Sequence, residues 1–123
     1  MVDEAEIRRQ KNSLRFTWYE KVLADPVARK RPNTLVFASH IKSTFNVDKN
    51  YAEFSFNDVV RKYGMARSTA ILSRNFLLKR GWIQIFERPK GPAGAHRALR
   101  YSLAFGPDDL LLDEHAPSSA GDT

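Results

Sequence analysis

Apolar residues recur at helical spacing in the first part of the chain. From residue 4 to residue 24 there is no proline or glycine, and Leu14, Trp18 and Val22 follow one another at intervals of four. Side chains at this spacing lie on one face of an α-helix. We therefore predict a helix over residues 4–24.

A proline and a basic run separate this helix from the next. The residue before Pro26 is driven out of the helical region, so the first helix is predicted to end there, and residues 28–32 are predicted to be a basic linker. Asn33 is the predicted cap of a second helix over residues 34–44. The predicted buried face of that helix consists of Leu35, Phe37, Ala38 and Ile41.

Turn-forming residues divide the middle of the chain. Residues 45–50 contain three Asn or Asp and predict a turn, and residues 51–56 predict a short strand. Asn57 is the predicted cap of a short helix over residues 58–63. Gly64 is predicted to end that helix, because glycine accepts the positive φ of a tight turn.

A longer helix and a pair of strands follow. The helix is predicted over residues 67–79, ended by Gly81. Its predicted inner side carries Ala70, Ile71, Leu77 and Leu78. Residues 82–86 and 99–103 have the β-branched, aromatic or alternating pattern of strands. The loop of residues 88–97 contains two Pro, two Gly and several basic residues, and is predicted to join these strands as a hairpin.

Charge is unevenly distributed along the chain. The formal net charge is +6, but residues 106–123 contain five acidic residues and no Lys or Arg, so the first 105 residues carry +11. Within residues 57–104, ten basic residues stand against two acidic ones. A body this basic indicates a polyanionic partner, either nucleic acid or an anionic membrane surface.

Composition narrows the classes of function. The chain has 123 residues, 42% of them hydrophobic, which is enough for one domain with its own core. It has no cysteine, which excludes disulfides and thiolate metal sites. His40, His96 and His115 are far apart in the sequence, and there is no phosphate-binding loop or nucleophile motif. We therefore predict no enzyme activity, no cofactor and no metal site.

The element order resembles the winged helix-turn-helix family. Residues 55–60 resemble the entry to the first helix of the motif, and residues 62–69 are similar to its turn, with a Thr opening the second helix. Residues 77–83 match the leucine, glycine and hydrophobic exit into the wing. The resemblance covers about residues 33–104. It is closest to the domains of bacterial, phage and plasmid regulators and replication-initiation proteins.

The resemblance implies an α+β fold, a winged helix-turn-helix with an extra N-terminal helix and a two-stranded basic wing. The corresponding division of the chain is an N-terminal helix and basic linker over residues 1–32, the winged domain over residues 33–105, and an acidic tail over residues 106–123. Ser73 and Arg74 depart from the family pattern, which usually has apolar residues there.

The family inserts the second helix of the motif into the DNA major groove, which is wide enough for one α-helix. The expected base-reading residues are Arg67, Ser68, Thr69, Leu72 and Asn75. Arg67 can pair with guanine, Asn75 with adenine, and Leu72 can touch a thymine methyl group. The alternative is that these are helix-capping and solvated surface residues.

Further contacts are expected outside that helix. In the wing, the residues expected near phosphates or the minor groove are Arg88, Lys90, His96 and Arg97. Candidate contacts to the flanking backbone, which can equally be solvated, are Arg29, Lys30, Arg31 and Lys62. If the N-terminal helix mates with a second copy instead of packing on its own domain, the expected contacts are Trp18, Val22 and Phe76.

The primary hypothesis is a sequence-specific double-stranded DNA-binding transcriptional regulator. The alternatives are a replication-initiation or mobile-element module, and a protein-interaction adaptor on a winged-helix fold. The acidic tail can aid solubility, fold back on the basic face, or bind another protein through residues 110–112. No stretch is apolar enough to span a membrane, so we expect a cytoplasmic, nucleoid-associated protein.

Overall fold

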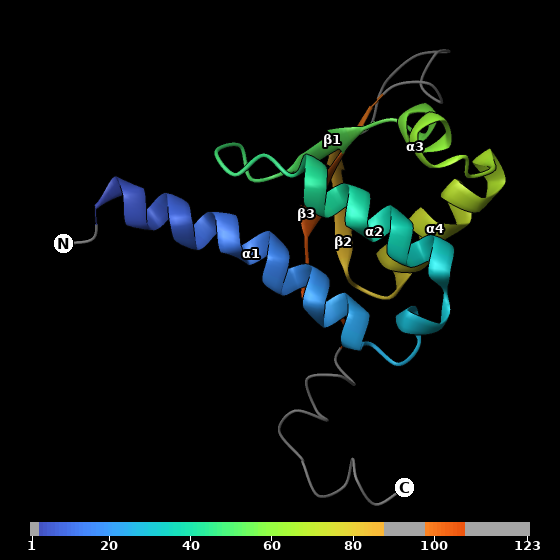
Figure 1. Cartoon of the computed structure of the whole chain (residues 1–123), viewed down its shortest axis with the longest axis horizontal. Helices are drawn as coiled ribbons and strands as arrows, with labels where there is room; N and C mark the ends of the chain where they lie inside the picture. Colours follow the sequence, from blue (N-terminus) through green and yellow to red (C-terminus); the bar gives the residue numbers. More distant parts are fainter. Residues whose placement is uncertain (1–2, 88–97, 108–123) are drawn as a thin grey trace, which may run out of the picture.

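Helices and a small antiparallel sheet make up the fold (Figure 1). The computed structural model describes residues 3–87 and 98–107. In chain order the elements are α1 (Glu4–Ala24), the 3-10 helix η1 (Ala28–Lys30), α2 (Pro32–Thr44), β1 (Ala52–Phe54), α3 (Phe56–Tyr63), α4 (Arg67–Lys79), β2 (Ile83–Glu87) and β3 (Leu99–Leu103). The predicted α+β class is confirmed, and the helices over residues 4–24 and 67–79 have the predicted bounds.

The three strands form one antiparallel sheet in the order β1-β3-β2. In the pairing of β1 with β3, Glu53 lies opposite Arg100. The register of β2 against β3 shifts between Ile85 and Glu87. Because β1 pairs with β3, the two ends of the chain segment that contains α3, α4 and β2 lie next to each other in the sheet.

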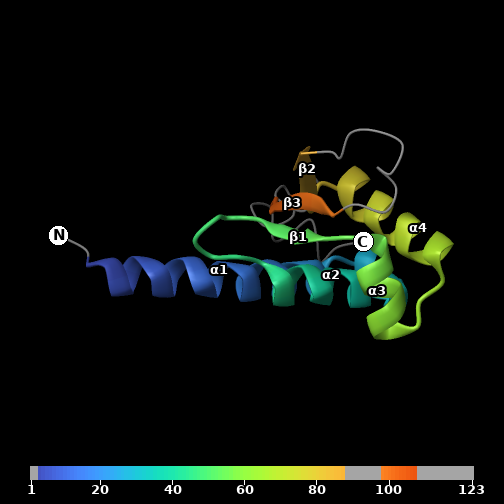
Figure 2. The ribbon, with the colours of Figure 1, turned by 90° about the horizontal axis from the view of Figure 1, so that it is seen from above.

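Helices α1 and α2 lie along one face of the sheet, and α3 and α4 lie at one end of the molecule (Figure 2). Alternation along the strands directs Ala52, Phe54, Ile83 and Tyr101 inward, and all four are buried. The first half of α1 extends beyond this body, and residues 3–10 are exposed. In the described part of the chain, no helix combines the length and apolar character needed to cross a membrane.

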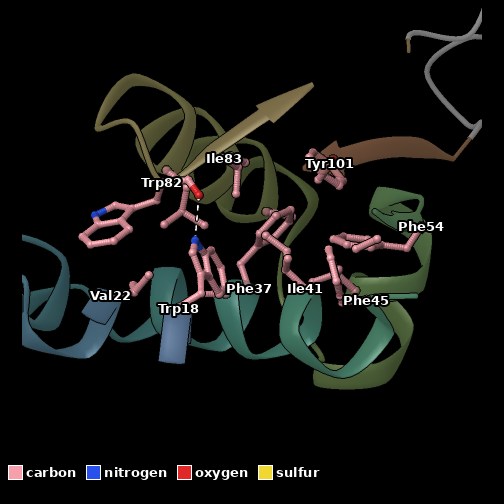
Figure 3. Packing of buried hydrophobic residues seen from close by; sticks show 14 of the residues in the cluster. Trp18, Val22, Phe37, Ile41, Phe45, Phe54, Trp82, Ile83 and Tyr101 are labelled. Carbon is pink, nitrogen blue, oxygen red and sulfur yellow. Dashed lines mark hydrogen bonds between the residues drawn. The ribbon is translucent and has the colours of Figure 1, made fainter. Parts of the chain in front are cut away.

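The inner stripe of α1 belongs to the core of the same chain (Figure 3). Trp18 and Val22 are fully buried together with Phe37 and Ile41 of α2. The indole Nε1 of Trp18 donates to the carbonyl oxygen of Trp82 at 2.8 Å. Trp18 and Val22, considered above as contacts to a second copy, instead pack inside their own domain, and neither has exposed surface left for a partner.

The connection between α1 and α2, predicted to be a linker, contains the 3-10 helix η1. Ala28 in η1 is fully buried. Helix α2 begins at Pro32 with Arg31 as its cap residue, so the prediction of Asn33 as the cap is wrong. Proline suits the first helical position because its φ is already fixed near the helical value and the amide hydrogen it lacks would have no partner there.

A buried carboxylate joins the C-terminal ends of α1 and α4. Asp25 is fully buried and accepts hydrogen bonds from Arg80 Nε at 3.0 Å and Arg80 Nη2 at 2.9 Å. It also accepts from Trp82 Nε1 at 2.7 Å and from the backbone N–H of Val27 at 3.0 Å. Burial alone raises the pKa of Asp25, but these hydrogen bonds outweigh it and hold the pKa below its ordinary value of 3.8.

After β3 the chain packs against Trp82. The N–H of Gly106 donates to the carbonyl oxygen of Gly81 at 2.9 Å. Gly106 has a φ of 89°, and a Cβ there would come within 2.8 Å of the Trp82 ring. This close approach requires glycine. The described chain ends at Pro107, and residues 108–123 of the predicted acidic tail lie outside the described residues.

Candidate nucleic-acid interface

A reciprocal cap determines where α3 begins. Ser55 Oγ accepts the N–H of Asp58 at 3.3 Å, and the Asp58 carboxylate accepts the N–H of Ser55 at 2.8 Å. The hydrogen bond from the Ser55 N–H, with Arg61 nearby, lowers the pKa of Asp58. Ser55 is therefore the cap residue, and the prediction of Asn57 as the cap is wrong. The capping box satisfies two backbone N–H groups, and Asn57 lies in the first turn.

A tight turn connects α3 to α4. Gly64 ends α3 in the left-handed conformation with a φ of 67°, as predicted. Met65 is buried, and Ala66 is the cap residue of α4. The buried Met65 anchors the turn, so that α4 starts at a defined place against α3.

The inner side of α4 differs in part from the predicted one. Ala70, Ser73 and Leu77 are buried, whereas Ile71 and Leu78 are half-buried. These three buried positions lie at i, i+3 and i+7, which is one helical face, and α4 packs against α2. Ser73 therefore takes a core position with a small side chain, although the family pattern suggests an apolar residue there.

The outer side of α4 carries the predicted base-reading residues. Ser68, Leu72 and Asn75 are exposed, and Leu72 has 61% of its surface accessible. Their spacing of i, i+4 and i+7 places them on one face. Arg67 and Thr69 are half-buried. The structure thus brings all five residues to the first two and a half turns of one helix.

Arg67 is held by two residues at the start of α3. Its Nη1 donates to Asn57 Oδ1 at 3.1 Å. Its guanidinium carbon lies 5.7 Å from the centroid of the Phe56 ring, within the range of a cation–π contact. Phe56 is itself half-buried and lies 6.5 Å from the Phe37 ring of the core.

Arg74 contacts the same Phe56 ring as Arg67, and it also contacts Asn75. Its guanidinium carbon lies 5.0 Å from the Phe56 centroid, and its Nε donates to Asn75 Oδ1 at 2.7 Å. Because Asn75 Oδ1 accepts this bond from Arg74, a bidentate pair between Asn75 and adenine would have to share or replace it.

Arg74 also lies near the buried Tyr101. Burial raises the pKa of Tyr101 to about 12, and the nearby Arg74 opposes this effect.

Sequence reasoning misses Phe56, Asn57 and Arg74 as parts of this surface. The spacing of Arg67 and Arg74 is a usable signal, because residues seven apart lie two turns apart on the same helical face. No local signal brings Phe56 to them, since the contact depends on how α3 packs against α4.

The basic residues outside α4 are only partly brought to it. All four backbone candidates are exposed, namely Arg29, Lys30, Arg31 and Lys62. The guanidinium carbon of Arg31 lies 4.4 Å from the Phe76 centroid, so it reaches the C-terminal half of α4 and covers part of Phe76. Lys62 Nζ lies 5.6 Å from the centroid of its neighbour Tyr63, at the end of α3. Arg29 and Lys30 lie in η1, which packs against α1 and α2.

The residues predicted to form the wing lie in a segment that the structure does not describe. Arg88, Lys90, His96 and Arg97 lie outside the described residues. The paired strands β2 and β3 form the base from which this segment departs. At that base, Arg100 Nε donates to Glu53 Oε1 at 2.9 Å.

His40 is buried beside α3. It is 7% exposed, its Nδ1 lies 2.9 Å from the Tyr63 hydroxyl, and its Nε2 has no hydrogen-bond partner among the described residues. Burial lowers the pKa of His40, the Lys62 charge lowers it further, and Asp58 partly opposes both. A second ring proton would be a buried charge, which the site disfavours.

We expect a pH-dependent stability from His40. In the unfolded chain His40 takes up a proton at its ordinary pKa of 6.5, whereas in the folded protein His40 takes up that proton only at lower pH. As pH falls below about 6.5, the unfolded state therefore binds more protons, and the free energy of unfolding decreases. Urea unfolding at pH 7.5, 6.5 and 5.5 measures this slope. H40Q should flatten it, and an unchanged slope in that variant would assign the pH dependence to other groups.

No comparison with known proteins adds to this geometry. No protein-family model matches the chain, and no curated protein or solved structure matches it either. In the described part of the chain, no three His, Cys, Asp or Glu residues are grouped so as to hold a metal ion.

Proposed function

We propose that this chain is a winged helix-turn-helix protein that binds double-stranded DNA sequence-specifically and regulates transcription. In this proposal α4 is the recognition helix and enters the major groove. The segment between β2 and β3 is the wing and approaches the backbone or the minor groove.

One observation carries the proposal, namely the two-sided character of α4. Its inner face is anchored on the core through Ala70, Ser73 and Leu77. Its opposite face exposes Ser68 and Asn75, which can hydrogen-bond to base edges. A helix that is anchored on one face and presents side chains able to contact base edges on the other is what major-groove recognition requires.

Charge and topology give further support. Between residues 57 and 104 the chain carries ten basic residues against two acidic ones, a balance that favours phosphate contact. The order β1-β3-β2, with two helices joined by the Gly64 turn between β1 and β2, agrees with the winged helix-turn-helix arrangement.

Selection of bound duplexes from a random pool, at near-physiological salt, tests the proposal. Affinity alone is insufficient, because a basic body binds any phosphate backbone. We expect an enriched motif. A pool with no enrichment after repeated rounds would reject sequence-specific binding. A palindromic motif would report binding by a dimer, and direct repeats would report binding by an array of copies. The genomic location of matching sites then separates a regulator, at a promoter, from a replication initiator, at an origin with repeated sites.

Arg67→Ala is expected to weaken binding to the selected duplex by about 1–3 kcal/mol and to relax the preference at one base pair, because it removes a base-edge contact. Lys62→Ala is the control. It should weaken all duplexes alike and make the salt dependence less steep, as expected for a phosphate contact. Titrations against the selected duplex and its single-base-pair variants measure both effects. Identical profiles for the two variants would contradict a reading role for Arg67.

A further inference from the structure

The first two residues of α3 contact the side chain that starts α4. Asn57 Oδ1 accepts from Arg67 Nη1 at 3.1 Å, and the Phe56 ring lies 5.7 Å from the Arg67 guanidinium carbon. The two residues therefore restrain Arg67 in different ways. The hydrogen bond sets the direction of one guanidinium nitrogen, and the ring limits where the guanidinium plane can lie.

We propose that Phe56 and Asn57 are positioning residues that set the base specificity of Arg67. This inference rests on the proposed DNA-binding function. A guanidinium is a planar fork with fixed donor directions, so holding one nitrogen orients the whole fork. Bidentate recognition of guanine depends on that orientation, whereas contact with a phosphate tolerates many orientations.

The restraint also lowers the entropy cost of the contact between Arg67 and its base. A free arginine side chain has many rotamers, and binding that immobilises it costs conformational entropy. Asn57 removes part of that freedom before DNA arrives. Loss of the restraint is expected to reduce discrimination at the base pair read by Arg67 by about 2- to 10-fold, the range that corresponds to immobilising one such side chain.

Phe56 also contacts Arg74, which in turn contacts Asn75, another residue expected to read a base. Arg74 lies 5.0 Å from the same ring and donates to Asn75 Oδ1 at 2.7 Å. The ring thus contacts Arg67 directly and contacts Asn75 through Arg74. It is anchored in turn by its neighbour Phe37 in the core, at 6.5 Å.

The test compares variants on the selected duplex and all its single-base-pair substitutions. Asn57→Ala should flatten the preference only at the position that Arg67→Ala flattens. It should leave the salt dependence unchanged, because it removes no charge. The double variant with Arg67→Ala should discriminate no worse than Arg67→Ala alone. Asn33→Ala, an exposed Asn in the first turn of α2, is the matched control and should behave as the unmodified protein.

Two further variants separate positioning from folding. Asn57→Asp keeps an acceptor oxygen for Arg67, so it should retain the base preference while weakening every duplex through its added negative charge. Phe56→Leu keeps an apolar side chain against Phe37 but removes the aromatic face. It should relax the preferences at the positions read by Arg67 and Asn75, with thermal unfolding confirming a folded protein.

Two outcomes would overturn the inference while leaving the proposed function intact. In one, Asn57→Ala keeps full discrimination at the Arg67 position. In the other, it weakens all duplexes uniformly, which would make Asn57 a backbone contact. Absence of any preferred sequence for the unmodified protein would overturn the proposed function, and the inference with it.

Discussion

Asp25→Ala is expected to lower the free energy of unfolding by about 3–5 kcal/mol, the usual cost of removing one partner of a buried ion pair. The substitution leaves the Arg80 guanidinium without its bidentate carboxylate, 2.9 and 3.0 Å away. It also removes the acceptor for Trp82 Nε1. The ends of α1 and α4 would lose the polar contact that joins them.

Urea unfolding at neutral pH measures this loss. Asp48→Ala is the matched control, because Asp48 also pairs with an arginine, at 3.1 Å from Arg8 Nη2, but both side chains are about 70% exposed. An exposed pair of this kind contributes less than about 1 kcal/mol. Equal effects of the two substitutions would contradict a structural role for the buried pair.

The same carboxylate makes stability depend on acid pH. The pKa of Asp25 is lower in the folded protein than its ordinary value of 3.8. Its contribution is therefore fully present above about pH 4 and is lost as pH falls through the folded pKa, because the unfolded state takes up the proton first. Unfolding midpoints measured from pH 5 downward should fall less steeply in Asp25→Ala than in the unmodified protein.

Trp18→Ala is expected to destabilise the protein by about 3–5 kcal/mol, the range for removing a large aromatic side chain from a core. Trp18 is fully buried, and its indole N–H donates to the carbonyl oxygen of Trp82. The substitution leaves a cavity, and the Trp82 carbonyl keeps only the hydrogen bond from the Ala104 N–H at 3.0 Å.

Phe16→Ala is the control for Trp18→Ala, because it removes an aromatic ring from the same helix at a position that is 47% exposed. Its expected cost is about 1 kcal/mol or less. Chemical unfolding compares the two variants, and sedimentation of each records its mass. A Trp18→Ala variant of unchanged stability but altered oligomeric state would show that Trp18 acts between copies of the chain.

Local pattern was sufficient for much of the fold. The bounds of α1 and α4 and the Gly64 turn follow from helical spacing and from the positive φ that glycine tolerates, and both are properties of neighbouring residues. The start of α3 was predicted wrongly although its signal is also local. Asn57 and Ser55 are both good caps by residue type, but only Ser55 has an acidic residue, Asp58, three positions later to complete the reciprocal bonds.

The candidate surface divides in the same way. The five residues expected to read bases are recognisable in the sequence, because their spacing along one helix places them together. The residues that contact them, such as Asn57, cannot be recognised in the sequence, because the contact between Arg67 and Asn57 depends on how α3 packs against α4. Arg31 likewise reaches Phe76 only because η1 is packed against the body.

The amino-acid sequence alone therefore predicts the four α-helices, the bounds of α1 and α4, the turn between α3 and α4, and the basic character of the chain, all of which arise from nearby residues or from composition. Tertiary packing decides which polar groups become buried partners. Asp25 and Arg80 are 55 residues apart, and Trp18 and Trp82 are 64 apart. Contacts at such separations form only when the helices pack around a shared core. Hydrophobic burial drives that packing, but because it is non-directional it does not determine which polar groups become partners.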